Sequence, residues 1–158
     1  VVGGGAGIAS LMLLITELKT RQVETSVLVG SMNESRLLSR TDIQDLGITP
    51  QIATDDGSVG SQGLVTDLLS RLLSKTSKQR ITVFTCGPYG MLSTVANICH
   101  KFGVVCQVAM ENRMGCALGV CLGCVCKVRI ETDSEEFEYQ RVCTEGPVFS
   151  APNIIWDM

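Results

Sequence analysis

The residues in this sequence that are best suited to chemistry are the cysteines near its C-terminal end. Cys116, Cys121 and Cys124 follow a C-x4-C-x2-C pattern, and Cys143 comes later in the chain. This is the ligand spacing of a plant-type [2Fe–2S] cluster, which is held by four thiolates. Three glycines in the same segment allow the backbone to wrap closely around inorganic sulfide. The pattern therefore predicts an electron carrier with these four cysteines as metal ligands.

Other interpretations of these cysteines stay open on spacing alone. Cys121-x2-Cys124 with two further thiolates would also make a four-cysteine zinc site. A disulfide framework is less favoured, because a chain of 158 residues with 45% hydrophobic residues can build its own core and no secretory signal is visible. Cys126 lies two residues beyond Cys124, so on an extended strand it points to the same side and could replace a ligand or stand idle.

The charge of the chain argues against several classes of partner. The net charge is −3, the pI is about 5.1, and Lys and Arg are scattered, so we expect no nucleic-acid partner. The apolar run over residues 8–15 is too short to span a bilayer. We therefore expect a soluble, cytoplasmic protein that does not enter a membrane, and in that compartment cysteines favour metal over disulfides. Cys99 and Cys106 lie in apolar surroundings, where we interpret them as small core residues.

Strand-like and helix-like segments alternate over the first two thirds of the chain. Runs rich in β-branched residues predict strands at 25–30, 49–53, 81–86 and 104–109. Apolar residues at helical spacing predict helices at 8–21, 63–74 and 88–102. This alternation predicts an α/β fold with a doubly wound, Rossmann-like parallel sheet.

After about residue 110 the composition changes, because glycine and cysteine become frequent and only short strands are expected, at 125–131 and 138–142. An acidic stretch over residues 131–138 would form a solvated hairpin connection. We therefore expect two domains, a nucleotide-binding domain over residues 1–110 and a small β domain with the [2Fe–2S] cluster over residues 111–158.

A glycine turn opens the chain, where the end of a strand leads into a helix. Its candidate cofactor-binding residues are Gly3, Gly4, Gly5 and Gly7. Glycines let phosphates approach the backbone, and the helix end supplies free N–H donors, so the turn predicts a pyrophosphate site. The fingerprint is imperfect, since Ile8 stands where a third glycine is expected. A tight packing turn is therefore the alternative.

Two more turns follow predicted strands. One contains Asp56 and Gly57, and the other is Cys86-Gly87-Pro88. All three turns fall at the carboxyl ends of strands, which is the edge of an open α/β sheet where ligands bind. For any single turn, glycine and proline could merely mark the end of a strand.

Taken together, these segments resemble the electron-transfer subunits of the NAD-dependent dihydroorotate dehydrogenases, a branch of the ferredoxin reductase-like family. The resemblance covers nearly the whole chain. It rests on the opening glycine turn, on residues 53–58, on Cys86-Gly87-Pro88, on residues 111–114 leading into the cysteines, and on residues 145–149. The cysteine segment and the Gly-Pro-Val-Phe sequence at 146–149 are its most specific parts.

The resemblance implies a set of cofactors, partners and site residues. NAD would lie across the carboxyl edge of the sheet, with Cys86 at the hydride-transfer site and Gly87 and Pro88 shaping it. The four cysteines of the opening pattern match the cluster ligands of the family. Electrons would pass from a dihydroorotate-oxidising catalytic subunit with FMN, through the [2Fe–2S] cluster and FAD, to NAD+ in de novo pyrimidine biosynthesis. The full-length proteins would form a heterotetramer with that subunit. Arg36 and Arg40 follow the second strand and could meet a 2′-phosphate, but the resemblance implies NAD, and mixed charge on a surface helix is the alternative.

The chain departs from the family in one large respect, since the N-terminal FAD-binding barrel has no counterpart in it. We therefore expect a fragment with an intact cluster site and weak FAD binding. With only Val1 and Val2 left of the central strand, we also expect oligomerisation or a rearranged sheet edge. Two alternatives remain, a related reductase subunit serving a hydrogenase or sulfite reductase, and a non-catalytic module whose four cysteines hold zinc.

Overall fold

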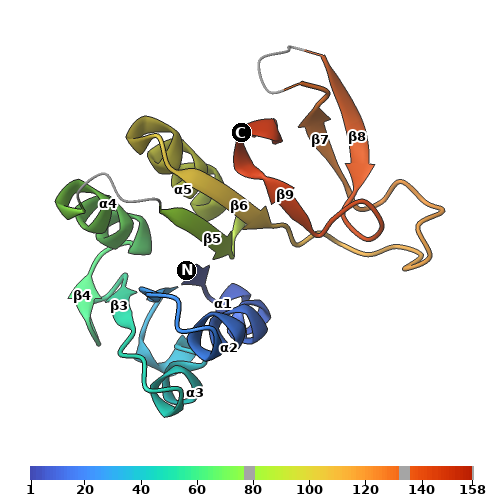
Figure 1. Cartoon of the computed structure of the whole chain (residues 1–158). Coiled ribbons are helices and arrows are strands. Elements are labelled where there is room, and N and C mark those ends of the chain that lie inside the picture. The colour runs from blue at the N-terminus through green and yellow to red at the C-terminus, as the bar shows by residue number, and fades with distance from the viewer. Residues whose placement is uncertain (77–80, 132–135, 158) are drawn as a thin grey trace.

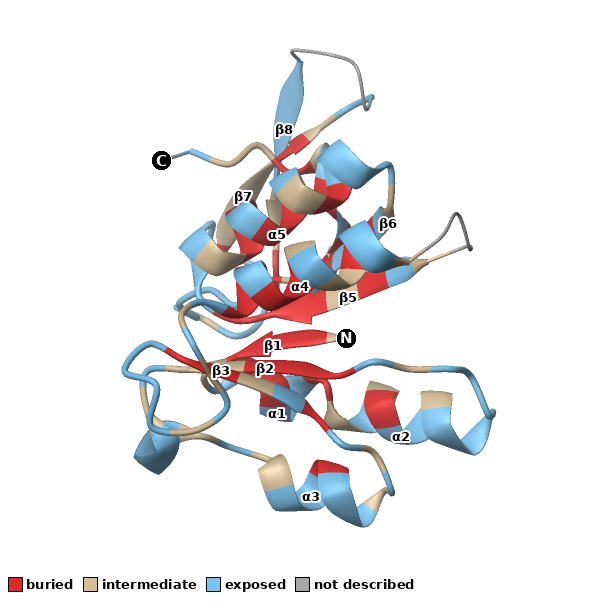
Figure 2. Ribbon diagram, turned by 90° about the vertical axis from the view of Figure 1, so that its left-hand side faces the viewer, coloured by how far each residue is buried: buried red, intermediate tan, exposed pale blue. Residues whose placement is uncertain are grey.

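The computed structural model describes residues 1–76, 81–131 and 136–157. A twisted sheet forms the middle layer, with helices on both of its faces, and a separate two-stranded hairpin stands at one end (Figures 1 and 2). The predicted doubly wound α/β class is confirmed. Residues 132–135, in the middle of the expected acidic connection, lie outside the described residues.

The large sheet has the strand order β4-β3-β2-β1-β5-β6-β9. All its pairs are parallel except that between β6 and β9. The strands are β1 (Val2–Gly4), β2 (Leu28–Ser31), β3 (Gln51–Thr54), β4 (Ser61–Gln62), β5 (Thr82–Cys86), β6 (Val105–Ala109) and β9 (Val148–Ser150). The sequence predicted four of them from their β-branched runs and β1 from the chain start. The two missed strands, β4 and β9, have two and three residues, too few for a periodic pattern.

The helices cover the two faces of the sheet unequally. Helices α1, α2 and α3 lie on one face, and α4 and α5 lie on the other (Figure 2). Their bounds are α1 (Gly7–Ser10), α2 (Met12–Thr20), α3 (Arg40–Asp45), α4 (Val65–Lys75) and α5 (Tyr89–Phe102), with short 3-10 turns η1 (Glu34–Arg36) and η2 (Ala151–Asn153). The helix predicted over residues 8–21 is split at Leu11 into α1 and α2. Helix α3 was not predicted, because it buries a single residue, Ile43, and so has no apolar stripe.

Two apolar layers hold the sheet between the helices. The layer under α4 and α5 includes Leu69, Leu92 and Val95 and continues to the hairpin residue Val128. The opposite layer joins α1, α2 and α3 to the sheet through Ile8, Ile15, Val29, Ile43 and their neighbours. Burial of these side chains holds the helices against the sheet, and the parallel pairing of its strands brings their carboxyl ends to one edge.

Strand β1 lies at the centre of the sheet, so the expected rearranged edge is wrong. Val2 pairs with Leu28 of β2 on one side and with Thr85 of β5 on the other. Gly3 and Gly4 lengthen the strand beyond the two residues expected from the sequence, because a glycine can extend a strand whose neighbours already hold it. At the opposite end of β1, β2 and β5 border a hollow of about 540 Å³. Oligomerisation stays a prediction.

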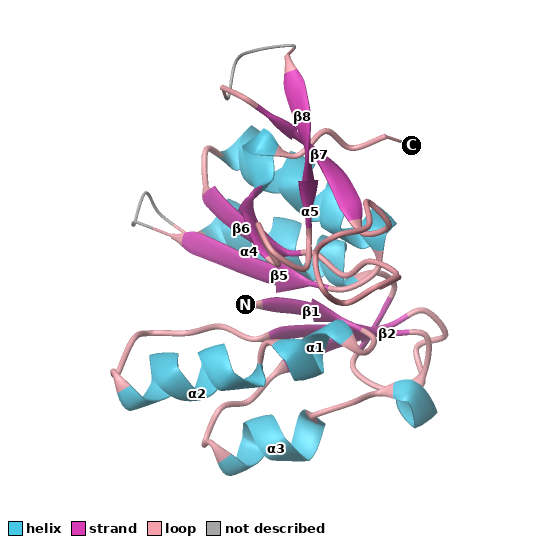
Figure 3. Ribbon diagram, turned by 90° about the vertical axis from the view of Figure 1, so that its right-hand side faces the viewer, coloured by secondary structure: helices cyan, strands magenta, loops and turns pink. Residues whose placement is uncertain are grey.

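The hairpin consists of β7 (Val125–Arg129) and β8 (Phe137–Arg141), paired antiparallel. A long loop joins it to β6 (Figure 3), and the chain then returns to the large sheet as β9 (Figure 1). The tail bridges back to the hairpin through Ile154 and Val128. The domain boundary at residue 110 stays a prediction. Among the described residues, no helix has both the length and the apolar character needed to cross a membrane.

Candidate functional site

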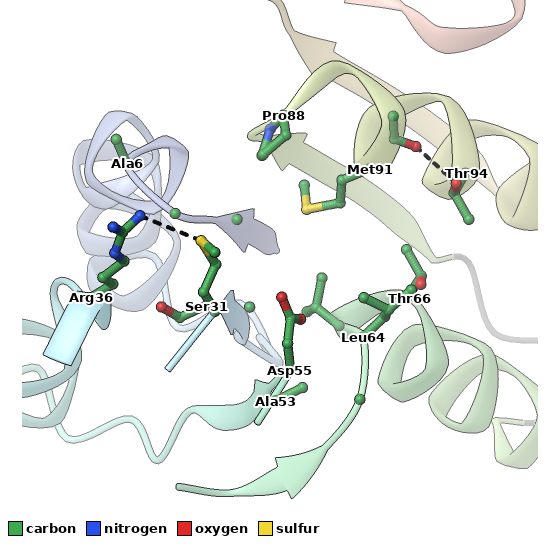
Figure 4. Close-up of a pocket in the computed structure, with 17 residues that line it drawn as sticks. Ala6, Ser31, Arg36, Ala53, Asp55, Leu64, Thr66, Pro88, Met91 and Thr94 are labelled. Carbon is green, nitrogen blue, oxygen red and sulfur yellow. Dashed lines mark hydrogen bonds between the residues drawn. The ribbon is translucent and has the colours of Figure 1, made fainter. Parts of the chain in front are cut away.

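A cavity of about 490 Å³ lies at the carboxyl edge of the sheet (Figure 4). It is formed by the ends of β1, β2 and β3, the start of α4 and the first turns of α5, so it lies where an open α/β sheet binds ligands. Its walls include Gly4, Gly5, Ala6, Gly30, Ser31, Met32, Arg36, Ala53, Asp55, Leu64, Thr66, Pro88, Met91 and Thr94.

The opening glycine turn divides into residues that face the cavity and residues that pack beneath it. Gly4 and Gly5 line the cavity. Gly3 lies in β1 against Ile8, and a Cβ on Gly7 would come within 2.5 Å of the backbone of Cys86. A Cβ on Gly4 would overlap the Met91 sulfur, and only Gly5 has nothing within 4 Å of such an atom. The turn is therefore closely packed at Gly3, Gly4 and Gly7 and open at Gly5.

The two adjacent aspartates after β3 point in different directions. Asp56 accepts hydrogen bonds from the Ser58 backbone N–H at 2.9 Å and from the Ser58 hydroxyl at 2.6 Å. These bonds lower the pKa of Asp56, which closes a turn with Gly57 and does not line the cavity. The side chain of Asp55 instead points toward the middle of the cavity (Figure 4). The sequence predicted Asp56 as a cofactor-binding residue, whereas the residue that lines the cavity is its neighbour Asp55.

The end of β2 carries no acidic residue. Ser31 is its last residue, and its hydroxyl donates a hydrogen bond to the Asn33 carbonyl at 3.0 Å. Arg36 reaches the same side of the cavity, with Nη1 3.4 Å from the Met32 sulfur. The polar groups at this end are therefore one hydroxyl, one guanidinium and the carboxylate of Asp55 (Figure 4).

Cys86 is buried at the end of β5, next to the glycine turn. Its Sγ lies 3.8 Å from Oε1 of Glu111, which also accepts a hydrogen bond from the Ser10 hydroxyl at 3.5 Å. Burial raises the pKa of Cys86, and the charge of Glu111 raises it further. The side chain is therefore a neutral thiol at neutral pH. Of the Cys86-Gly87-Pro88 turn, Pro88 lines the cavity directly.

The four cysteines of the opening pattern lie as two neighbouring pairs. Cys116 and Cys121 share the loop before β7, and the backbone N–H groups of Leu118 and Cys121 each approach the Cys116 sulfur at 3.4 Å. These N–H groups lower the pKa of Cys116 to about 6. The backbone N–H of Cys143, with help from its thiol, lowers the pKa of Cys124. The second pair, Cys124 and Cys143, therefore joins the residue before β7 to the turn after β8.

The donor set fits an iron–sulfur cluster. All eight cysteines have free thiols, and N–H groups already point at sulfur, as a cluster thiolate requires. A Cβ on Gly115 would lie 3.0 Å from the Cys121 sulfur, so the glycine allows the loop to close around it. Within the described parts of the chain, no three ligand-type side chains converge on one point. The two pairs are nevertheless close enough for Cys116 to act electrostatically on Cys143.

The remaining cysteines have other surroundings. Cys126 donates from Sγ to the Gln140 carbonyl at 3.7 Å, and burial raises the pKa of its thiol. Cys99 and Cys106 are 1% and 2% exposed, so their interpretation as core residues is confirmed.

Sequence reasoning did not select Asp55, Ser10 and Glu111 as site residues. Asp55 could have been found from its place directly after a strand. Glu111 follows β6, where Ala109 pairs with Cys86, so the register of β5 and β6 brings it to the thiol. No signal in the sequence points to Ser10, which reaches Glu111 across about a hundred residues of chain.

Comparison with known proteins agrees with this geometry. Residues 111–155 match the family model for the iron–sulfur cluster binding domain of dihydroorotate dehydrogenase B. A chain from the structure of an NADH-dependent reduced ferredoxin-NADP oxidoreductase superposes with a TM-score of 0.78 at 24% identity. The superposition covers 98% of this chain and 52% of the other, and it shows a shared fold.

Curated relatives match over nearly the whole chain. The dihydroorotate dehydrogenase B (NAD(+)) electron transfer subunit of Caldanaerobacter subterraneus is 36% identical over 99% of this chain and 58% of its own length. The corresponding subunit of Fusobacterium nucleatum is 32% identical over 98% of this chain and 56% of its own length. The chain thus spans a little over half the length of these relatives. Over nearly its whole length the chain is thus similar to part of the dihydroorotate dehydrogenase B electron transfer subunits.

Proposed function

We propose that this chain is the NAD-binding and cluster-binding part of an electron transfer subunit. The whole protein would carry electrons from a dihydroorotate-oxidising subunit through a [2Fe–2S] cluster and FAD to NAD+, in pyrimidine biosynthesis. The observation that carries this proposal is the contact between the two sites. Glu111, five residues before the cysteine Cys116, lies beside the Cys86 thiol at the nucleotide edge. Residues 1–110 would form the nucleotide domain and residues 111–158 the cluster domain.

In this proposal Cys116, Cys121, Cys124 and Cys143 hold the cluster. A [2Fe–2S] cluster accepts and releases one electron at a time. The chain's own part is to present the four sulfurs and to donate N–H groups to them, as Leu118 N–H does at Cys116.

The cavity at the sheet edge would take NAD. A nicotinamide exchanges a hydride, which is two electrons at once. The backbone of Gly4 and Gly5 would face the pyrophosphate, and Asp55 would accept hydrogen bonds from the ribose next to adenine. The other candidate residues would stabilise the turns around the cavity without lining it. They are Gly3, Gly7, Asp56, Gly57 and Gly87.

At the other end of the cavity, Cys86 and Pro88 would border the nicotinamide. Because burial and Glu111 raise the pKa of Cys86, its sulfur keeps its proton. A neutral thiol adds no negative charge beside a ring that must change charge during hydride transfer. Ser10 would hold the Glu111 carboxylate in place through their hydrogen bond.

FAD is proposed for the whole protein because the resemblance to the ferredoxin reductase-like family implies it, and the matched relatives extend beyond the part that this chain covers. A flavin can exchange electrons singly or in pairs, which suits it to stand between a cluster and a nicotinamide.

The catalytic partner would be an FMN-containing dihydroorotate dehydrogenase subunit, in a heterotetramer. The surface of the cluster loop supports a partner at this place. Leu118, Val120 and Leu122 are 79%, 78% and 69% exposed, and large apolar side chains gathered on one exposed loop favour a protein interface.

Serine substitution tests the ligand assignment. We expect Cys116→Ser and Cys143→Ser to lose most of the visible absorption of anaerobically purified protein, because each removes one thiolate. Cys126→Ser, on the same hairpin, should keep the absorption, since its thiol bonds a backbone carbonyl. Loss of absorption in Cys126→Ser together with full retention in Cys143→Ser would refute the assignment. A colourless protein with stoichiometric zinc would refute the redox function itself.

A further inference from the structure

Arg141 makes an unusually complete set of contacts for a residue at a strand end. It is the last residue of β8 and pairs with Val125, the residue directly after Cys124. Its Nη1 donates to the Gly119 carbonyl at 2.6 Å, and its Nε donates to Oε2 of Glu145 at 3.0 Å. Nη2 bonds Oε1 of the same carboxylate, and the Arg141 backbone N–H donates to Oε2 at 2.6 Å.

These contacts join the two segments that carry the cysteines. Gly119 lies in the loop between Cys116 and Cys121, and Glu145 lies two residues beyond Cys143. Gly119 has φ of +76°, and a Cβ there would lie 2.5 Å from the Thr144 side chain. The loop therefore rests directly on the turn that contains Cys143, and among the hydrogen bonds of the described residues the Arg141 guanidinium links the two.

Arg141 and Glu145 form an ion pair, and the orientation of the guanidinium determines which of the two charges faces the cysteine loop. Glu145 occupies the edge formed by Nε and Nη2, while Nη1 faces the cysteine loop. The positive end of the pair is thus nearer to Gly119 than its negative end is. A lysine could not make all of these hydrogen bonds. Only the planar guanidinium of an arginine can bond a carboxylate with one edge and a carbonyl with the other.

We propose that Arg141 is a positioning residue for the cluster site, which holds the loop at Gly119 against the Cys143 turn and raises the reduction potential through its charge. The inference rests on the proposed function, since it requires a cluster on the four cysteines. Net charge and hydrogen bonding around an iron–sulfur site set its potential. A nearby positive charge favours the form that holds one more electron.

The test is a redox titration of the cluster in anaerobically purified holoprotein, followed by EPR, with dithionite as the electron donor. Arg141→Gln should lower the midpoint potential, because the positive charge is lost and the Glu145 carboxylate is left without its guanidinium partner. Glu145→Gln should raise it, because a negative charge is removed. Arg141→Lys should stay near the wild-type potential while retaining less cluster after gel filtration, since it keeps the charge and loses the fork.

Arg129→Gln is the matched control. Arg129 lies on the same hairpin, but its guanidinium bonds the carbonyls of Pro152 and Ile154, roughly 17 Å along β7 from Cys124. This variant should leave both the potential and the retained cluster unchanged.

Opposite shifts in Arg141→Gln and Glu145→Gln support the proposal, because a purely structural role would not reverse sign. Arg141→Gln could also retain no cluster at all. The proposal is then supported if Arg129→Gln and Arg141→Lys still retain the cluster. It is overturned if Arg129→Gln loses the cluster equally. A wild-type potential in Arg141→Gln also overturns it. A wild-type protein without iron and sulfide would instead refute the proposed function, so the two failures are distinguishable.

Discussion

Replacing Gly7 by alanine tests how closely the glycine turn is packed against the end of β5. A Cβ at Gly7 would lie 2.5 Å from the carbonyl carbon and oxygen of Cys86 and from the backbone nitrogen of Gly87. Ordinary contacts begin at 3.4 Å, so the two segments must separate by roughly 0.9 Å, the difference between these distances. All three neighbours are backbone atoms, so no side-chain rotation relieves the clash.

The expected cost follows from this overlap. Overpacking a close-packed site destabilises a protein by about 1–3 kcal/mol. For a chain of this length each kcal/mol lowers Tm by roughly 2–4 °C, so we expect Gly7→Ala to melt roughly 2–12 °C lower. Thermal denaturation followed by circular dichroism measures this. The same displacement moves Cys86 and Gly87, so binding of 5′-ADP to the sheet edge should weaken in parallel.

Gly90→Ala is the control with the opposite sign. Gly90 lies in α5, and nothing lies within 4 Å of a Cβ there. Alanine is favoured over glycine by about 0.8–1 kcal/mol in a helix interior. Gly90 is the second residue of α5, so we expect this variant to melt slightly above the wild-type temperature. The packing argument is refuted if Gly7→Ala melts at the wild-type temperature, or if the two variants lose the same stability.

The remaining predictions concern the nucleotide edge and the cluster loop. Asp55→Asn should reduce the preference for 5′-ADP over 2′,5′-ADP by roughly fivefold, since two unit charges about 4 Å apart in water repel by about 1 kcal/mol. Asp56→Asn should leave that preference unchanged in the same calorimetric titration, and equal effects of both changes would contradict the assignment of Asp55. Glu111→Gln should shift the alkylation of Cys86 by iodoacetamide to lower pH, because Glu111 raises the pKa of this thiol, and peptide mass mapping identifies the modified cysteine. An unchanged pH profile would contradict the contribution of Glu111 to this pKa. Leu118→Ser should leave Tm unchanged, because the side chain is 79% exposed, and should weaken copurification with the catalytic subunit; unchanged copurification would place the partner elsewhere.

Much of the fold could be predicted because its central elements have strong local patterns. The β-branched runs predicted β2, β3, β5 and β6, and the apolar spacing of Leu68, Leu69 and Leu72 predicted α4. Helix α3 and strand β9 have no such pattern. Strand β9 forms because Phe149 packs into the core beside β6, which is a tertiary contact that local sequence does not encode.

The candidate site was predictable where spacing alone defines it, as for the four cysteines. It was not predictable where the choice between neighbours depends on the backbone. Asp55 faces the cavity and Asp56 does not because the turn after Thr54 closes on Ser58. Likewise, Arg141 meets Gly119 only because the hairpin register places Arg141 opposite Val125.

The central claim is that the four cysteines hold a [2Fe–2S] cluster next to a nucleotide site. Iron and acid-labile sulfide analysis of anaerobically purified protein, combined with EPR after dithionite reduction, tests it most directly. We expect about two iron and two sulfide per chain and a single paramagnetic signal of one reduced cluster, since four thiolates hold one such cluster. Stoichiometric zinc with no sulfide and no EPR signal would contradict the claim.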